Sequence, residues 1–197
     1  MAQPHLNLYD AHMIISVWPN SQINDRPASD GQLQGQLQWS DHIVPCALGR
    51  GGINAQKQEG DGRTPIGRFP LRRVFYRPDR IDKPITFLSV HPLQPDMGWC
   101  DDPTHQAYNT LVRQPFSAGH EQLWRTDTLY DIIVEVGHND NPVISHHGSA
   151  IFLHVAHPRY QPTEGCVAIA VENLLGLLKQ CDQHALLNIQ AQTPEVC

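Results

Sequence analysis

Hydrophobic and polar residues alternate without a break from Gly31 to Trp39, with glutamine at every position of the polar face. A period of two sustained over a whole segment predicts a β-strand. Turn-forming residues from Asn20 to Asp30 predict that this strand forms a hairpin with Ile14–Trp18. His42–Leu48 is predicted to be another strand, at an edge or in an irregular region, because Pro45 has no N–H to donate to a ladder.

The rest of the chain adds further strands and one clear helix. Leucines and Cys181 at helical spacing predict a helix over Val171–Cys181. Pro78–Gln122 is rich in proline, has few periodic runs and is predicted to be a long loop of the kind that walls binding sites. Short apolar runs predict strands at Phe69–Phe75, Tyr130–Val136, Ser149–Val155 and Ala185–Gln190. The pattern predicts a mainly β protein with one or two helices.

Length and composition limit the protein class. The 197 residues suit one compact domain over residues 1–197, and 40% hydrophobic against 17% charged residues suits a folded core. A net charge of −6, from 14 basic and 20 acidic residues, argues against binding of nucleic acid, which needs clustered Lys and Arg. No apolar run approaches the ~18 residues of a membrane span.

Two further features concern the cellular compartment. Five cysteines with wide, irregular gaps and no CxxC pair form neither a disulfide framework nor a zinc motif, so reduced thiols are expected. Met1–Asp10 lacks the charged and apolar regions of a signal peptide, so we expect a cytoplasmic protein. If a leader was removed before this numbering begins, the expected location is instead the periplasm.

Glycine-rich loops at Gly49–Ile53 and Glu59–Gly67 suggest phosphate binding at first sight. A P-loop requires Gly-Lys-Ser/Thr leading into a helix, whereas here Pro65 and a strand follow. The second loop is therefore interpreted as a turn into a strand.

Two residues that could carry out catalysis lie in and after the apolar run Ser149–Val155. His154 is in an otherwise apolar strand, and Cys166 follows twelve residues later, after a loop that contains two prolines. If the loop folds back, thiol and imidazole come within reach, and a neighbouring imidazole makes a thiol nucleophilic. Gly165 would let a carbonyl approach, and local N–H groups would form an oxyanion hole. The structural alternative is that both are packed core residues of adjacent strands.

His154, the loop and Thr163-Glu-Gly-Cys166 resemble the signature of the L,D-transpeptidase catalytic domain, the YkuD-type family. Further similar blocks, such as Glu59–Gly67 and Gly98–Pro103, extend the resemblance over about residues 42–180. The resemblance implies a β-sandwich-like fold that carries a Cys–His couple. Two departures are that Glu164 stands where many relatives have histidine and that the gap from His154 to Cys166 is shorter.

The resemblance also implies a reaction. His154 takes the proton of Cys166, and the thiolate attacks the carbonyl at the L-centre of a diamino acid linked to terminal D-Ala. The thioester is resolved by an amine in a transpeptidase or by water in an L,D-carboxypeptidase. The expected partners are peptidoglycan stem peptides or muropeptides, with no cofactor. Because no leader is seen, we expect a cytoplasmic L,D-carboxypeptidase of murein recycling, with a periplasmic cross-linking transpeptidase as the alternative. The oligomeric state stays open.

Several other residues are candidates for substrate binding. Arg50, Arg63 and Arg159 carry guanidinium groups that match carboxylates, and Arg159 is preferred because it lies in the loop between His154 and Cys166. Trp99 and Tyr108 are expected to line the groove. Solvated loop arginines and core aromatics are the structural alternatives.

Two rival functions remain. His146, His147, His154 and His157 suggest a metal-dependent amidase. Against it, the chain has no HExxH pattern, and adjacent histidines point to opposite faces of a strand. The second rival is a non-catalytic peptidoglycan-binding module, against which the intact Cys–His pair argues.

Overall fold

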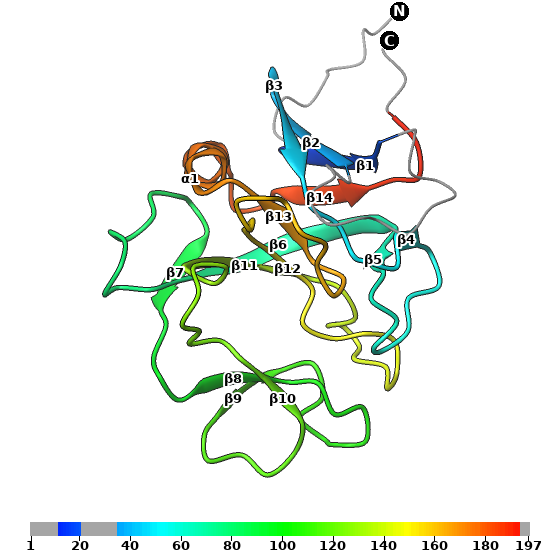
Figure 1. The fold of residues 1–197 in the computed structure, drawn as a ribbon, viewed down its shortest axis with the longest axis vertical. Coiled ribbons are helices and arrows are strands. Elements are labelled where there is room, and N and C mark those ends of the chain that lie inside the picture. The colour runs from blue at the N-terminus through cyan, green and yellow to red at the C-terminus, as the bar shows by residue number, and fades with distance from the viewer. Residues whose placement is uncertain (1–11, 21–34, 194–197) are drawn as a thin grey trace, which may run out of the picture.

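The computed structural model describes residues 12–20 and 35–193. This part of the chain is mostly β structure with one helix (Figure 1), so the prediction of a mainly β protein is confirmed. The predicted turn after Asn20, the first part of the strand before Gly35 and Cys197 lie outside the described residues. The elements are β1 (Ile14–Pro19), β2 (Gly35–Trp39), β3 (His42–Cys46), β4 (Ile53–Asn54), β5 (Thr64–Pro65), β6 (Gly67–Tyr76), β7 (Ser89–Pro92), β8 (Met97–Cys100), β9 (Leu111–Arg113), β10 (His120–Gln122), β11 (Ile132–Val136), β12 (Phe152–Val155), β13 (Val167–Ile169), α1 (Val171–Gln180) and β14 (Leu186–Ile189).

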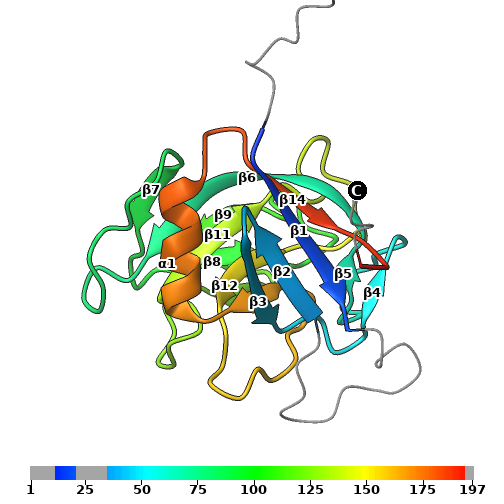
Figure 2. The ribbon, with the colours of Figure 1, turned by 90° about the horizontal axis from the view of Figure 1, so that it is seen from above.

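One large sheet organises the fold. Its strands follow the order β13-β12-β11-β6-β14-β1-β2-β3, with β7 paired to β6 at the side. The two ends of this order meet, because Ala47 and Ala168 exchange backbone hydrogen bonds of 2.8 and 3.0 Å. The sheet is therefore nearly closed, and its two halves face each other across the core (Figure 2). This closure brings the chain after β3 next to the start of β13.

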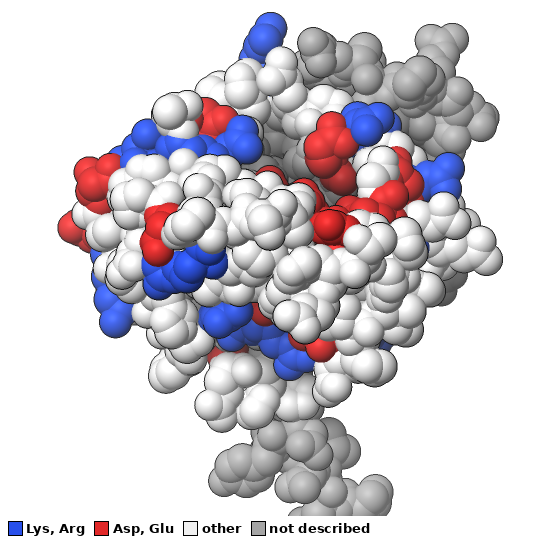
Figure 3. Space-filling model, turned by 90° about the horizontal axis from the view of Figure 1, so that it is seen from below, with Lys and Arg blue, Asp and Glu red and all other residues white. Residues whose placement is uncertain are grey.

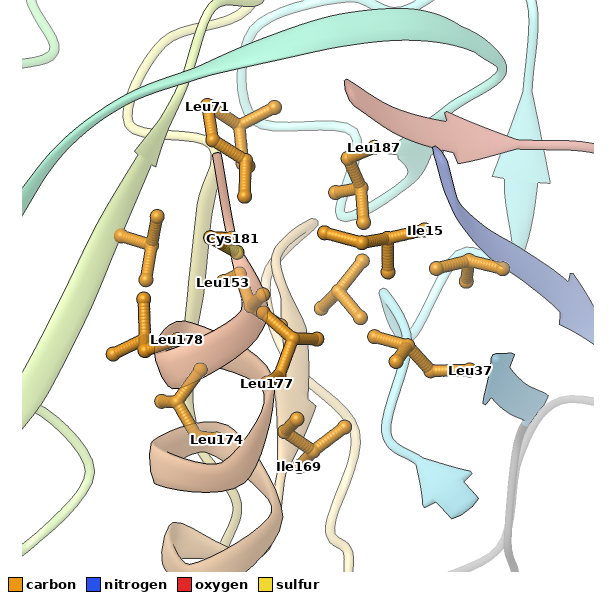
Figure 4. Packing of buried hydrophobic residues seen from close by; sticks show 14 of the residues in the cluster. Ile15, Leu37, Leu71, Leu153, Ile169, Leu174, Leu177, Leu178, Cys181 and Leu187 are labelled. Carbon is orange, nitrogen blue, oxygen red and sulfur yellow. The ribbon is translucent and has the colours of Figure 1, made fainter. Parts of the chain in front are cut away.

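The main core fills the space inside this curved sheet. Ile15, Leu37 and Leu187 point into it from separate strands and are fully buried (Figure 4). Helix α1 packs against the same core with Leu174, Leu177 and Leu178, which are spaced three or four residues apart and share one helix face. Each buried leucine adds about 2 kcal/mol to the free energy of unfolding, because its apolar surface is removed from water in the folded state. None of the helices in the described residues is long and apolar enough to cross a membrane.

The segment from Pro78 to Gln122 differs from its prediction as one long loop. Strand β7 pairs in parallel with β6, and β8 pairs with both β9 and β10 in a separate three-stranded sheet. These strands have only three or four residues, and all four residues of β8 are buried. A strand buried on both faces shows no alternation, which is why the period of two was absent.

Candidate active site

Strands β12 and β13 hold the candidate catalytic residues. They run in parallel, with Leu153 opposite Val167 and His154 opposite Ala168. Cys166 comes directly before β13, so its side chain lies on the same face as Phe152 and His154. Residues two apart on one face of neighbouring strands have Cα atoms roughly 7–8 Å apart, which long side chains can bridge. The thiol and the imidazole therefore face one side of the sheet as diagonal neighbours.

The Cys166 thiol is held by the backbone of the strand beside it. Its sulfur donates to the carbonyl oxygen of Ala150 at 3.2 Å and accepts from the N–H of Phe152 at 3.3 Å. The residue is 6% exposed. Burial, and secondarily the charge of Glu121, raises the pKa of the thiol to about 12. The resting group is therefore a protonated thiol.

His154 is equally buried and is also neutral. Its Nδ1 lies 2.9 Å from the carbonyl oxygen of Val155, so this nitrogen carries the proton and Nε2 is the basic one. Burial lowers the pKa of the imidazole from its ordinary 6.5 to about 4. The Tyr130 ring packs edge-on against it at 5.2 Å between ring centres. No hydrogen bond joins His154 to Cys166, but both residues line one cavity.

The turn before Cys166 is fixed by side-chain hydroxyls. Thr163 and Thr64 both donate to the carbonyl oxygen of Cys166, at 2.7 and 3.3 Å. Gly165 has a φ of +136°, and a Cβ atom there would lie 2.9 Å from the carbonyl oxygen of Arg63. Only glycine fits this backbone conformation and this close approach without strain. The segment that contains Thr64 and the turn from Thr163 to Cys166 therefore together fix the backbone next to the sulfur.

A cavity of about 420 Å³ lies over the thiol and the imidazole. Acidic residues dominate its charged lining, and Figure 3 shows Asp and Glu side chains gathered around a hollow on this face of the molecule. Burial raises the pKa of Glu121 and of Asp101, as expected for carboxylates with restricted access to water. The charged residues of the lining are Lys57, Glu59, Asp101, Glu121, Arg125 and Glu164.

The arginines expected to bind substrate lie elsewhere. Arg50 is 58% exposed at its side chain and pairs at 2.7 Å with Glu164 of the cavity lining, but Arg50 itself does not line the cavity. Arg63 and Arg159 are exposed and do not line the cavity either. Arg159 is close to His154 and Cys166 in sequence, but it is not part of the cavity over them. The structure thus brings none of the three to the cavity wall.

The two aromatic candidates lie behind the cavity wall. Trp99 is 4% exposed, donates from Nε1 to Asn109 at 2.9 Å and packs edge-on against Phe152. Tyr108 is also buried and donates its hydroxyl to Glu59, which in turn accepts a hydrogen bond from Ser149 at 2.8 Å. Tyr108 therefore holds a cavity carboxylate in place rather than lining the cavity itself.

The four histidines of the metal-amidase alternative fall into two places. His154 and His157 line the first cavity, whereas His146 and His147 line a neighbouring cavity of about 790 Å³. Within residues 12–20 and 35–193, no group of three or more His, Cys, Asp or Glu side chains is arranged to hold a metal ion. The two cavities share Lys57 and Glu59 in their walls.

Sequence reasoning missed the residues that give the cavity its charge. Lys57 is 7% exposed and donates to Asp61 at 2.6 Å. Arg125 lies over the ring of Tyr130, and Glu121 accepts a hydrogen bond from the hydroxyl of Tyr130. These residues come from irregular or very short elements, where periodicity carries no information. The unusual Lys-x-Glu-x-Asp spacing from Lys57 to Asp61 was the one sequence pattern that could have indicated these charged residues.

Comparison with protein families identifies the overall architecture. The YkuD family model, described as the L,D-transpeptidase catalytic domain, matches residues 29–189, which is most of the chain. Comparisons with curated proteins and with solved structures found no match. The matched range contains the whole candidate site, from Lys57 to Cys166.

Proposed function

Because the chain belongs to the YkuD family of L,D-transpeptidase catalytic domains, we propose that it is an L,D-carboxypeptidase acting on peptidoglycan peptides. Its substrate is a tetrapeptide muropeptide, from which it removes the terminal D-Ala through a thioester at Cys166. The observation that carries the proposal is the pairing of β12 with β13, which puts Cys166 and His154 on one face beneath one cavity.

The protonation states suggest how the first step proceeds. A thiol with a pKa of about 12 and an imidazole with a pKa of about 4 do not form an ion pair at neutral pH. The proton therefore moves from sulfur to His154 only as the sulfur attacks the peptide carbonyl. The negative charge passes to the carbonyl oxygen, which the backbone N–H of Cys166 can stabilise, whereas the N–H of Gly165 donates to Thr163 Oγ1 at 3.2 Å.

In the second step the peptide C–N bond breaks. The imidazolium of His154 donates its proton to the nitrogen of D-Ala, which leaves as the free amino acid, and the diamino acid stays on Cys166 as a thioester. Water then attacks the thioester carbonyl and gives its proton to His154, and the tripeptide departs while the thiol is restored. Carboxylates of the cavity wall, such as Glu59 and Asp101, suit the ammonium group of the bound diamino acid.

The layout of the cavities favours water over a second peptide as the acceptor. An attacking acceptor replaces the leaving amine, so it must enter on the His154 side of the sulfur. The larger second cavity lies at the opposite end, where its wall shares Lys57 and Glu59 with the first. A water needs roughly 30 Å³ and can enter beside His154. An acceptor stem would need a peptide-sized site on the side of His154, whereas the larger cavity lies at the other end. The second cavity suits the remainder of the donor peptide.

We place this reaction in the cytoplasm, where soluble muropeptides are the substrates at hand. Fractionation of cells that produce the protein from its native gene tests this part separately. Recovery with periplasmic markers would contradict the cytoplasmic placement and favour a transpeptidase.

Product analysis tests the reaction itself. Purified protein is incubated with a defined tetrapeptide, and the products are weighed by mass spectrometry. We expect tripeptide and free D-Ala in equal amounts. Cross-linked dimers without tripeptide would refute hydrolysis and support transpeptidation.

Variants of the two central residues provide the control. Cys166→Ala removes the nucleophile, and we expect tripeptide formation to fall by more than about a thousandfold. Cys181→Ala removes another buried thiol, one that lies in the α1 core away from the cavity, and should keep activity. Residual activity of Cys166→Ala above about a thousandth of the wild type would exclude it as the nucleophile.

A further inference from the structure

We propose that Arg125 binds the carboxylate of the departing D-Ala and makes the enzyme selective for peptides with a free C-terminal carboxylate. The proposal rests on the proposed function, since it takes Cys166 as the nucleophile and His154 as the proton donor. It assigns the recognition of the peptide end to a residue outside the motifs of the sequence.

The chemistry fixes the side of the cavity on which D-Ala must lie. His154 protonates the leaving nitrogen, so that nitrogen lies within hydrogen-bond distance of the imidazole. Lys57 lies at the other end of β12, where it contacts Gly148 just before the strand. Among the described residues that line the cavity, Lys57 and Arg125 are the two permanent cations. Arg125 is the one beside His154.

Distances around Tyr130 support this assignment. The guanidinium carbon of Arg125 lies 5.1 Å from the centre of the Tyr130 ring, and the His154 ring lies 5.2 Å from the same centre. The guanidinium of Arg125 and the imidazole of His154 are therefore at most about 10 Å apart. A hydrogen bond of about 3 Å joins imidazole to the leaving nitrogen. The leaving nitrogen and the carboxyl carbon of D-Ala are about 2.5 Å apart. A charge-assisted hydrogen bond of about 3 Å then reaches a guanidinium nitrogen. One D-Ala with these two hydrogen bonds is long enough to bridge even the upper limit of this separation.

Arg125 also has donors to spare. Its Nε and Nη2 donate to the carboxylate of Asp127, at 3.0 and 2.6 Å, so one edge of the guanidinium is fixed. In the described part of the chain Nη1 makes no hydrogen bond, and the side chain is 35% exposed. The outer edge formed by Nη1 and Nη2 remains for a bidentate carboxylate.

The acidic lining of the cavity adds to the preference for placing the substrate carboxylate beside Arg125. Glu59, Asp101 and Glu164 repel an incoming carboxylate elsewhere in the cavity. Lys57 already donates to Asp61 and, at 2.7 Å, to the carbonyl oxygen of Gln58. A free carboxylate is therefore stabilised beside Arg125, which orients the peptide with D-Ala next to His154. A peptide that ends in a neutral amide loses this interaction.

The test compares one tetrapeptide in two forms, with a C-terminal carboxylate or a C-terminal carboxamide. For the wild type we expect kcat/KM to be about 10- to 100-fold higher for the acid, the usual range for a hydrogen bond between charged groups. Arg125→Gln should lower kcat/KM for the acid by the same factor and leave the amide unchanged within about twofold. Arg125→Lys should restore part of the preference, because it keeps the charge without the fork.

The matched control is Arg113→Gln. Arg113 lies on β9, pairs with Asp96 and is far from the cavity lining, so this variant should keep the preference of the wild type. Equal rates for acid and amide in the wild type would overturn the proposal. An equal loss for both substrates in Arg125→Gln would also overturn it, because Arg125 would then act only by supporting Tyr130 and His154.

Binding to Cys166→Ala separates this proposal from the proposed function. Calorimetry with this inactive variant should show tighter binding of the acid than of the amide, and the added change Arg125→Gln should remove the difference. If the wild type releases no tripeptide but the acid still binds more tightly, hydrolysis is refuted and the carboxylate site stands. Equal binding of acid and amide overturns the carboxylate site.

Discussion

Lowering the pH from 7 to 4 should destabilise this protein through one buried side chain, His154. Burial lowers the pKa of the folded-state imidazole to about 4 from its ordinary 6.5. Between these values the unfolded chain binds a proton that the folded chain excludes. The free energy of unfolding therefore falls as the pH drops below about 6.5, and the full contribution is present only above that pH.

The magnitude follows from the shift. A difference of 2.5 between the two values, at about 1.4 kcal/mol per pKa unit, gives about 3 kcal/mol lost between pH 6.5 and 4. Other groups also titrate in this range, and they include His138, whose pKa is likewise lowered by burial. The contribution of His154 is therefore taken as the difference between the wild type and His154→Gln, in which the other groups cancel.

Urea unfolding followed by tryptophan fluorescence at pH 7, 6, 5 and 4 measures this difference. We expect the wild type to lose about 3 kcal/mol more than His154→Gln over this range. His42→Gln replaces an exposed histidine and should follow the wild type. Parallel curves for the wild type and His154→Gln would refute the conclusion that the imidazole is buried and neutral.

Three further outcomes follow from the same geometry. The kcat/KM for tripeptide formation should stay level from pH 8 to about 5 and fall with a midpoint near 4, where His154 gains a proton; a midpoint at 6.5 would contradict the neutral pair. Gly165→Ala should lower the free energy of unfolding by about 1–3 kcal/mol, because of its positive φ and the nearby Arg63 carbonyl. Gly176→Ala, with open space around its Cβ in α1, should raise it by about 0.5–1 kcal/mol, and equal effects in urea unfolding would argue against strain at Gly165. Leu177→Ala should cost about 2–5 kcal/mol in the same assay, since the residue is fully buried, and a cost below 1 kcal/mol would contradict its place in the core.

The strands that sequence periodicity predicts are those with one buried face. β2 alternates buried and half-buried residues from Gly35 to Trp39, and the same alternation is legible in the sequence. β8, with every residue buried, carries no such signal, so the sequence predicts a loop there. The helix from Val171 was predicted because its leucines repeat at three and four residues, a spacing that only one face of a helix explains.

For the candidate site, the sequence supplied the reactive pair but not its surroundings. A histidine in an apolar strand and a cysteine after glycine stand out in the chain itself. Arg159 lies between them in sequence yet does not line their cavity, whereas Arg125 lies far from both in sequence and does line it. Proximity along the chain was therefore a poor guide to the binding residues.

The sequence by itself determined the helix, the longer strands of the large sheet, the family and the two candidate catalytic residues, because each rests on a local pattern of side chains. The tertiary structure decided that the sheet closes from Ala47 to Ala168, and this closure joins segments more than a hundred residues apart around Cys166. It also decided that the thiol and the imidazole are buried and neutral, and that Arg125 stands beside them. Burial, pKa and charge depend on every segment that packs around a group, so they exist only once the chain has folded.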